Sequence, residues 1–544
     1  MESLDVAIVG AGFAGLYMLH RARKLGLRAR VFEQGGGVGG TWYWNRYPGA
    51  RCDVESLEYS YSFDERLQQE WRWSERYASQ PEILRYLEHV AERFDLKKDI
   101  EFNCRITSAS FDGKCWVVSD GKTQVRTSFL VMATGCLSST NHPKFDGLDS
   151  YQGKTYHTGR WPHEGVDFTG LRVGVIGTGS SSVQSIPIIA AQAHSLVVFQ
   201  RTATYSVPAR NAPLDPAEVA RVKADYAGLR ARNRQMINGF GSRTPRSTES
   251  ALAATREERA RAFEGRWQQG GLYYLGAFGD LILDARANDL AAEFVRGKIR
   301  ETVRDPAVAK LLEPRQPIGC KRLCVDSGYF ETFNRPNVRL VDVNRTPIER
   351  FTPHGLRAGG EDFAFDAVVF ATGFDAMTGA LNRIDIRGRG GVALADKWRA
   401  GPLTYLGLGV AGFPNLFIIA GPGSPSVLTN MVVSIEQHVD WIAGCLAHLR
   451  AHGRATIEAS PRAEQGWVAH VNEVASRTVY PGCNSWYLGA NIPGKTRVFM
   501  PLLGFPAYAE RCAEVAARGY EGFEIRGRSP NSGVRAPSPI GPDQ

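Results

Sequence analysis

The sequence predicts an α/β fold with two Rossmann-like dinucleotide-binding domains and a helical insertion in the second. Glycine-rich turns that follow short apolar strands and open helices occur twice, at 10–15 and at 177–182. Apolar strands that end in Ala-Thr-Gly also occur twice, at 129–135 and at 368–373. The 544 residues are too many for one hydrophobic core, so we expect at least two domains.

The first glycine loop follows the strand 5–9 and carries Gly10, Gly12 and Gly15. We expect the first glycine to make the tight turn, the second to admit a pyrophosphate and the third to let helix and strand pack closely. The next strand ends in Glu33, whose carboxylate would accept hydrogen bonds from ribose hydroxyls. A glycine-rich turn without a ligand is the alternative, but strand, glycines, helix, strand and acid in this order favour a nucleotide site.

An irregular loop is predicted at 35–56, because this stretch is rich in glycine and aromatic residues. Trp42 and Trp44 offer flat faces that could cover an aromatic cofactor, whereas core packing is the alternative for either ring. Asp53 and Arg51 in the same loop could form no more than a surface ion pair.

The second glycine loop follows the strand 171–176 and keeps Gly177 and Gly179, but Ser182 replaces the third glycine. A serine adds a Cβ where helix and strand approach closely, which weakens the motif without removing the two glycines that face phosphate.

The strand after this loop ends without an acid and continues into Arg201 and Thr202. An acid would repel a 2′-phosphate, whereas Arg201 can pair with it bidentately and Thr202 can donate its hydroxyl. The second domain is therefore expected to prefer NADPH over NADH.

The order of these signals predicts that the chain crosses between the two domains and returns. Ala, Arg and Glu at helical spacing indicate solvated helix faces in the insertion, where we expect no chemistry. The predicted segments are a first domain in two parts, 1–140 and 376–525, a second domain in two parts, 141–210 and 316–375, the helical insertion, 211–315, and a disordered Pro/Ser/Gly-rich tail, 526–544.

Composition narrows the classes of partner. The net charge is +9, but no dense Lys/Arg run with interleaved aromatic residues occurs, so we expect no nucleic-acid partner. The amino terminus enters a strand at once, which leaves no room for a signal peptide, and no apolar run reaches the roughly 18 residues of a membrane span. We expect a cytoplasmic protein without an obligate protein partner.

The nine cysteines are scattered, and their odd number and unpaired spacing predict reduced thiols. Cys320 and Cys324 lie close together, but no second Cys/His pair completes a zinc site. We expect both to be small buried hydrophobes and the protein to hold no metal.

Between the two glycine loops, residues 151–162 read YQGKTYHTGRWP, which is the pattern FxGxxxHxxxWP with Tyr151 in place of Phe. Together with WYWNRYPGARCD at 42–53, this stretch resembles the fingerprint of the type I Baeyer–Villiger monooxygenases. His157 is interpreted as a linker residue that couples the domains, without a role in proton transfer. The resemblance extends over about residues 4–525.

The resemblance implies FAD in the first domain, NADPH in the second and conversion of a small-molecule ketone to an ester or lactone with O2. In this family NADPH reduces FAD, oxygen adds as a C4a-peroxide, and the deprotonated peroxide attacks the carbonyl. On sequence alone Lys321 and Arg322 would be a surface basic pair. The resemblance makes Arg322 the catalytic cation that stabilises the peroxide and the adduct, Asp53 its orienting partner, and Lys321 a ligand of the 2′-phosphate.

The resemblance also implies which residues lie near the ligands. Val427 and Leu428 would line the substrate cavity. Retained NADP⁺, held in part by Trp486, would shield the intermediate from water. The implied cofactor-binding residues are Gly10, Gly12, Gly15, Glu33, Thr41, Trp42, Trp44, Arg51, Asp53, Tyr59, Gly177, Gly179, Ser180, Ser181, Arg201, Thr202, Lys321, Met431 and Trp486.

Within the family, stretches such as VPARNAPLDP and AGPGSPS resemble the phenylacetone monooxygenase type, which implies aryl or other bulky hydrophobic ketones as substrates. An N- or S-oxygenating flavin-containing monooxygenase is the alternative, although the 42–53 loop and Trp161-Pro162 favour the ketone-oxidising branch. A disulfide reductase would need a CxxC motif, which the sequence lacks. A non-catalytic flavin protein would not need Arg322 and Asp53.

Overall fold

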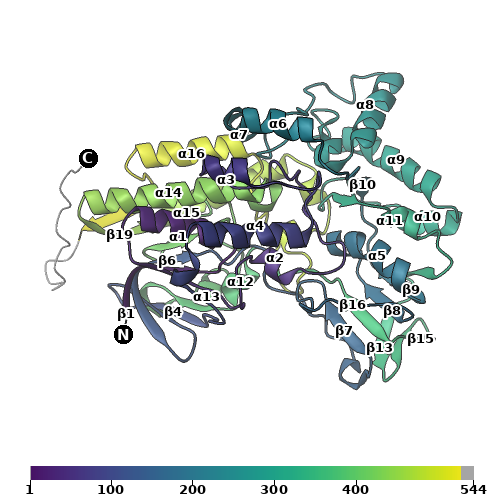
Figure 1. The fold of residues 1–544 in the computed structure, drawn as a ribbon, viewed down its shortest axis with the longest axis horizontal. Coiled ribbons are helices and arrows are strands. Elements are labelled where there is room, and N and C mark those ends of the chain that lie inside the picture. The colour runs from purple at the N-terminus through teal and green to yellow at the C-terminus, as the bar shows by residue number, and fades with distance from the viewer. Residues whose placement is uncertain (1, 528–544) are drawn as a thin grey trace.

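Residues 2–527 are described by a computed structural model and form two α/β parts that lie side by side (Figure 1). The part on the left of this view is built from the beginning and the end of the sequence, and the part on the right from the middle. The predicted α/β class with Rossmann-like parallel strands is confirmed.

An eight-stranded sheet forms the centre of the first part. In spatial order its strands are β17 (Asp385–Arg387), β4 (Ser108–Phe111), β5 (Trp116–Ser119), β6 (Gln124–Met132), β1 (Glu2–Val9), β2 (Ala29–Phe32) and β3 (Ile100–Glu101), and β18 (Leu416–Ile418) also pairs with β6. Strand β1 runs parallel to both β2 and β6, and its residues 6–8 are fully buried. The apolar run before the first glycine loop is thus a central strand.

Helix α1 (Phe13–Lys24) follows β1 directly and packs against α14 (Met431–Ala451), a long helix from the end of the sequence. This contact joins the two segments of the first part. Its other helices are α2 (Thr41–Trp44), α3 (Glu65–Glu70), α4 (Gln80–Arg93), α12 (Gly379–Asn382), α13 (Leu394–Lys397), α15 (Pro461–Ser476) and α16 (Phe505–Ala517). The strands β19 (Arg454–Ala459) and β20 (Phe523–Gly527), far apart in the chain, form an antiparallel pair.

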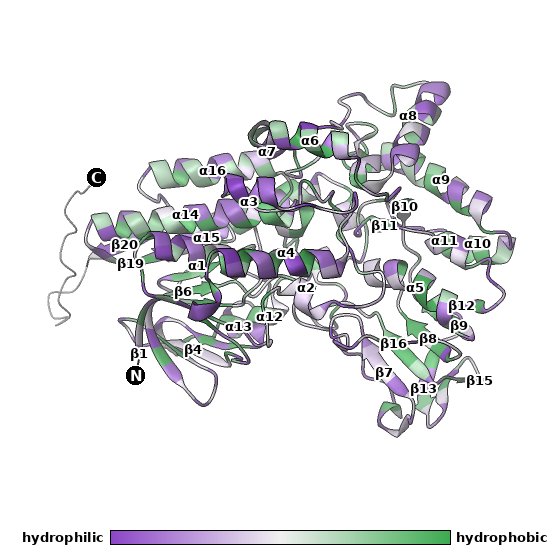
Figure 2. Cartoon of the chain, viewed as in Figure 1, coloured by the Kyte–Doolittle hydropathy of each residue, from purple (hydrophilic) through white to green (hydrophobic). Residues whose placement is uncertain are grey.

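A five-stranded parallel sheet forms the centre of the second part. In spatial order its strands are β12 (Val338–Asp342), β9 (Ser195–Gln200), β8 (Arg172–Ile176), β16 (Ala367–Phe370) and β7 (Lys154–His157). Figure 2 shows β8 and β16 as hydrophobic, as strands covered on both faces require. Helices α5 (Ser180–Gln192) and α11 (Tyr329–Thr332) and the antiparallel strands β13 (Ile348–Thr352), β14 (Gly355–Ala358) and β15 (Glu361–Ala364) complete this part.

Helices predominate in the sequence between β9 and β12. They extend from the second part at the upper right of Figure 1. The elements are β10 (Ser206–Pro208), α6 (Pro216–Ala224), α7 (Tyr226–Arg234), α8 (Arg256–Gln269), α9 (Ala285–Thr302), α10 (Pro306–Leu312) and β11 (Cys324–Asp326). Short 3-10 helices in the chain are η1 (Lys97–Asp99), η2 (Leu148–Ser150), η3 (Gly271–Gly276), η4 (Arg389–Gly391), η5 (Ser426–Leu428), η6 (Tyr480–Gly482) and η7 (Trp486–Leu488).

Two expectations from the sequence are wrong. Arg526 and Gly527, assigned to the tail, belong to β20, because this strand pairs with β19 as far as Gly527; the rest of the predicted tail, 528–544, lies outside the described residues. Cys320 and Cys483 form a disulfide, whereas all nine cysteines were expected to be reduced. The two cysteines are 163 residues apart in the sequence, so only the tertiary fold brings them together.

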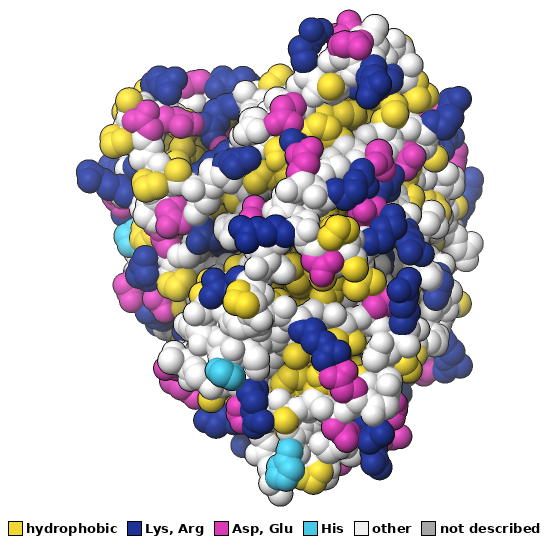
Figure 3. Space-filling model, turned by 90° about the vertical axis from the view of Figure 1, so that its right-hand side faces the viewer, with side chains coloured by type: hydrophobic (Ala, Val, Ile, Leu, Met, Phe, Trp, Pro, Cys, Tyr) yellow, Lys and Arg dark blue, Asp and Glu magenta, His cyan; other side chains and the backbone are white. Residues whose placement is uncertain are grey.

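The molecular surface carries charges of both signs. On the face shown in Figure 3, Lys and Arg side chains are interspersed with Asp and Glu. Within residues 2–527 no helix has the length and apolar character to cross a bilayer.

Candidate active site

The first glycine loop connects β1 to α1 and has backbone geometry that other residues cannot adopt. Gly10 has a φ of 106°, and a Cβ at this position would lie 2.5 Å from the carbonyl oxygen of Ala133. A Cβ on Gly15 would lie 1.8 Å from the carbonyl oxygen of Gly10. These close approaches leave the amino end of α1 open to a ligand, as a dinucleotide pyrophosphate requires.

Glu33 ends β2 beside this loop and is buried. Its two carboxylate oxygens accept hydrogen bonds of 2.7 Å from the backbone N–H groups of Ala11 and Gly35. Burial raises the pKa of the Glu33 carboxyl, although the backbone hydrogen bonds oppose that shift. The Glu33 carboxylate therefore also stabilises the loop. Each of its oxygens keeps a lone pair that can accept a hydrogen bond from a ribose hydroxyl.

The second glycine loop repeats the first with one difference. Gly177 has a φ of 113°, and a Cβ there would lie 2.4 Å from the carbonyl oxygen of Ala371, whereas the space at Gly179 is open. Ser182 is fully buried in α5, and its hydroxyl has no hydrogen-bond partner within the described part of the chain. The fold thus accommodates the extra Cβ at the third position.

Two serines at the start of α5 face in different directions. The Ser180 hydroxyl lies 3.3 Å from the Cys324 sulfur, while Ser181 lies beside the buried phenol of Tyr47. Together with the open Gly179 they form the amino end of the helix, where phosphate oxygens bind most readily.

Arg201, Thr202 and Lys321 lie at the carboxyl end of β9 and on the loop before β11. Burial, and then the positive charge of Arg201, lower the pKa of the Lys321 amine. Within residues 2–527 neither cation has a carboxylate partner. Two neighbouring cations without a carboxylate partner favour binding of an anion such as a 2′-phosphate. No acid at the end of β9 would repel that phosphate.

Arg322 is held by two segments from the other part of the molecule. Its Nε and Nη2 donate to the Asp53 carboxylate at 3.0 and 2.6 Å, and its Nη1 donates to the carbonyl oxygen of Val427 at 2.8 Å. A guanidinium has five N–H groups, so an Nη1 hydrogen is still available to an anionic ligand. The predicted Arg322–Asp53 pair therefore exists as a bidentate contact.

The charge of Arg322 is permanent. Burial is the largest single influence and lowers the pKa of the guanidinium, but the charge and hydrogen bonds of Asp53 and the neighbouring Tyr487 together raise the pKa above its ordinary value. Side chains of both residues are half-buried, with 26% and 22% exposed. The site thus presents a fixed positive charge in a partly dehydrated place, where electrostatic interactions are stronger than in water.

Arg51, two residues before Asp53, does not pair with it. The Arg51 Nη1 donates to Glu75 at 2.8 Å and to the carbonyl oxygen of Tyr77 at 2.7 Å. The alternative of a surface Arg51–Asp53 ion pair is wrong, because Arg322 takes the Asp53 carboxylate.

The aromatic loop is folded onto the amino end of α1. Trp42 is buried, and its Nε1 lies 3.3 Å from the Tyr59 hydroxyl. Trp44 is half-buried and Thr41 is exposed, both on the short helix α2. Tyr59 also packs edge-on against Phe13 at the start of α1. The Trp42 indole therefore belongs mainly to the core, while the half-buried Trp44 indole is available to an aromatic cofactor ring.

Substrate residues predicted from the sequence adjoin the arginine. Val427 and Leu428 form η5 and are buried, and the half-buried Met431 begins α14. Because the Val427 carbonyl oxygen accepts from Arg322, η5 is adjacent to the cation.

Trp486 and Tyr487 lie on η7, in a segment attached to the arginine loop by the Cys320–Cys483 disulfide. Tyr487 is buried, and burial raises its pKa to about 12, although the charge of Arg322 opposes that shift. The sequence singled out Trp486 but not the tyrosine, the disulfide or the Val427 carbonyl. No sequence signal near Cys320 or Cys483 could have indicated the cross-link.

His157 lies where the chain passes from one part to the other. Its Nε2 is 3.3 Å from both the carbonyl oxygen of Asn141 and the hydroxyl of Thr372, and its Nδ1 accepts from the backbone N–H of Gly159 at 3.0 Å. Burial, and then the nearby His142, lower the pKa of His157 to about 4, so the ring is neutral at pH 7. These contacts fit a linker role.

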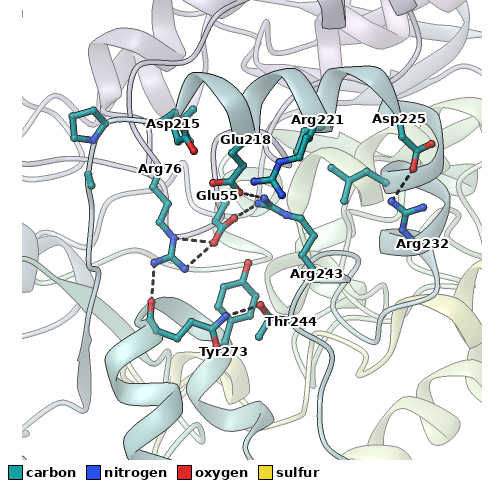
Figure 4. Close-up of a pocket in the computed structure, with 16 residues that line it drawn as sticks. Glu55, Arg76, Asp215, Glu218, Arg221, Asp225, Arg232, Arg243, Thr244 and Tyr273 are labelled. Carbon is teal, nitrogen blue, oxygen red and sulfur yellow. Dashed lines mark hydrogen bonds and ion pairs between the residues drawn. The ribbon is translucent and has the colours of Figure 1, made fainter.

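A cavity of about 600 Å³ lies apart from these residues, between the start of the sequence and the helices α6 and α7 (Figure 4). Glu55 at its centre pairs with Arg76 and Arg243, and Arg243 also pairs with Glu218. Neither Asp53 nor Arg322 lines it. Most of its acids and arginines pair with one another, as expected of a packing contact between parts.

Comparisons with known proteins agree with this geometry. Residues 7–230 match the family described as pyridine nucleotide-disulphide oxidoreductase. A Baeyer–Villiger monooxygenase of Pseudooceanicola batsensis is 44% identical over 96% of this chain and 96% of its own length. The chain belongs to the Baeyer–Villiger monooxygenase family. Its predicted class of enzyme and its cofactors, FAD and NADPH, are confirmed.

Two further similar proteins differ in the activity that their names state. A solved steroid monooxygenase bound to NADP is 54% identical, with a TM-score of 0.92 over 97% of this chain and 100% of that one. A phenazine N-monooxygenase of Lysobacter antibioticus is 41% identical over 95% of this chain and 96% of its own length.

Proposed function

We propose that this Baeyer–Villiger monooxygenase converts aryl or other bulky hydrophobic ketones to esters or lactones, with NADPH and O2 as co-substrates. The observation that carries the proposal is Arg322, fixed between the Asp53 carboxylate and the Val427 carbonyl beside buried apolar side chains. The similarity to a steroid monooxygenase supports a bulky substrate.

The residues around the flavin site have distinct tasks in this proposal. Bound FAD, reduced by NADPH, supplies the oxygen-transfer chemistry. Gly10, Gly12 and Gly15 would admit its pyrophosphate to the end of α1, and Glu33 would hold the ribose. Trp42, Trp44 and Tyr59 would flank its ring.

NADPH would lie across the second glycine loop. Gly177, Gly179 and the serines that follow would bind its pyrophosphate, while Arg201 and Lys321 would share the 2′-phosphate with Thr202. Trp486 would cover the nicotinamide half and exclude water.

Arg322 would stabilise the negative charge that develops on oxygen as the ketone carbonyl is attacked. A preorganised donor does this without reorientation, as in an oxyanion hole. Asp53 keeps the guanidinium in place and charged, while Val427 and Leu428 hold the hydrophobic side of the ketone. We place the FAD site in 1–140 and 376–525 and the NADPH site in 141–210 and 316–375.

Product mass spectrometry on the purified holoenzyme tests the substrate class. The panel is phenylacetone, a steroid methyl ketone and cyclohexanone, with NADPH consumption followed in parallel. We expect products one oxygen heavier, near one per NADPH, for the two bulky ketones and slower turnover of cyclohexanone. Rapid turnover of cyclohexanone alone would contradict the proposed class.

N- or S-oxygenation is the second candidate, because a phenazine N-monooxygenase is 41% identical to this chain. Phenazine and a thioether belong in the same panel. Oxides from these compounds without any ester from the ketones would favour this candidate.

We also infer that the enzyme acts in the cytoplasm on small molecules, without an obligate protein partner. Seven of its cysteines are free thiols, which is typical of a reducing compartment.

A further inference from the structure

The disulfide between Cys320 and Cys483 joins two segments that the proposed reaction needs together. Cys320 directly precedes Lys321 and Arg322, and Cys483 lies three residues before Trp486. The bonded cysteines are 163 residues apart in the chain. Neighbours of Cys320 such as Ile318 pack in the core of the second part, and neighbours of Cys483 such as Tyr480 pack in the core of the first.

The segment after Cys483 has few other attachments to the arginine loop. Within residues 2–527, no backbone hydrogen bond joins residues 480–490 to residues 316–324. Instead, the backbone N–H groups of Leu488 and Ala490 donate to the Ser485 carbonyl oxygen, and that of Met500 donates to the Tyr487 carbonyl oxygen. Elsewhere the segment is anchored by Tyr487 in the core of the first part, by Asn491 on the Phe374 carbonyl oxygen and by Lys495 on Asp375. The disulfide adds the covalent link between this segment and the arginine loop.

We propose that Cys320 and Cys483 are positioning residues, whose disulfide holds Trp486 and Tyr487 against Lys321 and Arg322 and whose reduction releases them. This inference rests on the proposed roles of Arg322 and Trp486. In the reduction, a dithiol gives two electrons and two protons: the protein S–S bond breaks, two cysteine thiols form, and the dithiol becomes a disulfide.

Access to the bond is one-sided. Cys320 is fully buried, whereas Cys483 is half-exposed. An incoming thiolate therefore reaches the Cys483 sulfur first and expels the Cys320 thiolate, which takes up a proton from solvent. The second thiol of the reagent then attacks the mixed disulfide and releases Cys483 as a thiol. Disulfides of proteins in a reducing compartment are mostly redox-sensing or transient, so this bond is expected to follow the thiol state of the cell.

The test uses the purified FAD-containing enzyme in two states, oxidised and treated with dithiothreitol, then desalted without exposure to air. Thiol titration of the denatured protein should give seven thiols in the oxidised state and nine in the reduced state. Peptide mass spectrometry without reduction should recover the 320–483 cross-link. Reduction should weaken NADP⁺ binding about tenfold, because the released segment must be ordered again on binding. It should also raise the hydrogen peroxide formed per NADPH.

Variants separate the cross-link from other effects of thiol reagents. Cys483→Ser, and independently Cys320→Ser, should bind NADP⁺ like the reduced enzyme and lose all response to dithiothreitol. Cys115→Ser is the matched control, because Cys115 is a free, half-exposed cysteine in the turn between β4 and β5. This variant should respond to dithiothreitol like the wild type.

Two results would overturn the inference. One is nine thiols in the purified enzyme even after incubation with oxidised glutathione. The other is a cross-link whose reduction changes neither NADP⁺ affinity nor peroxide release. NADP⁺ affinity and thiol count do not depend on the ketone, so a failure to oxidise any ketone would count against the proposed function and not against this inference.

Discussion

Arg322 combines a permanent charge with a planar fork of donors, and both properties matter in its contact with Asp53. Replacing it with lysine keeps the charge but loses the bidentate geometry. We expect Arg322→Lys to lower kcat for ketone oxidation by about 10²–10³, the cost of removing one preorganised oxyanion donor. FAD content and NADPH-dependent flavin reduction should change far less, as stopped-flow spectra would show.

Arg335→Lys is the control for this substitution, since Arg335 is an exposed arginine on the same stretch of chain. Wild-type rates are expected for it. An Arg322→Lys enzyme that formed ester at the wild-type rate would exclude the assigned role of the guanidinium.

Arg201 has an exposed side chain at the carboxyl end of β9, where the 2′-phosphate is expected. We expect Arg201→Ala to raise the KM for NADPH about 10- to 100-fold, because charged hydrogen bonds contribute about 1.5–3 kcal/mol. The KM for NADH should hardly change. Arg345→Ala, at another exposed arginine after β12, should leave both values unaltered; equal losses for the two cofactors in Arg201→Ala would refute the phosphate assignment.

The two strand–loop–helix elements differ at the third glycine position, Gly15 in the first and Ser182 in the second, and this allows a paired test. Gly15→Ala would place a Cβ 1.8 Å from the Gly10 carbonyl oxygen, so α1 must shift away from β1. We expect this variant to be purified with little FAD. Ser182→Ala removes a buried hydroxyl without a partner and should raise the denaturation midpoint, in line with the roughly 1–3 kcal/mol cost of such a group. Flavin absorbance and thermal unfolding measure both effects. A normal flavin content in Gly15→Ala would contradict the packing argument.

Elements with local signals were predictable from sequence. The strand and helix around Gly10, the strand before Gly177 and the helix after Met431 follow from apolar runs bounded by glycines or by a capping residue. The cysteine bridge was not predictable, because nothing local to Cys320 or Cys483 encodes their proximity. The Arg51–Asp53 pair, which was the alternative on sequence alone, is wrong for the same reason, because adjacency in sequence does not fix a partner. The resemblance named Arg322, 269 residues away.

In the candidate site, residue types were easier to predict than their partners. Asp53 and Arg322 were named through a family resemblance, whereas the third contact of the arginine is a backbone carbonyl, that of Val427. Every residue has a carbonyl group, so a sequence cannot indicate which one is used. Strand ends, in contrast, are placed by the parallel sheet itself, which explains why Arg201 could be located.

At the scale of the whole molecule, His157 joins segments of chain that pass between the two parts. Its pKa is about 4 in the folded protein and about 6.5 when unfolded, so the unfolded state binds more protons between these values. The free energy of unfolding should therefore fall as pH falls from 6.5 to 4, by up to about 3 kcal/mol from this residue.

We expect His157→Asn to flatten the dependence of the denaturation midpoint on pH in this window. Other buried histidines, such as His438, keep part of the slope, because burial lowers the pKa of His438 to about 3. His470→Asn, at an exposed histidine, should leave the slope as in the wild type. An unchanged slope in His157→Asn would show that this ring is not held neutral by the fold.

The contacts of Arg322 with Asp53 and Val427, here called its clamp, also have a consequence for the order of events during protein synthesis. Asp53 and Arg322 are 269 residues apart, and Val427 follows 105 residues later. A ribosome releases the first flavin-binding segment long before the cation, and the cation before the carbonyl that completes its clamp. Because the first part is completed only by β18 and α14, the flavin site and the contacts of Arg322 are both finished late in synthesis. Oxygen insertion is thus reserved for chains that have been translated almost to their end.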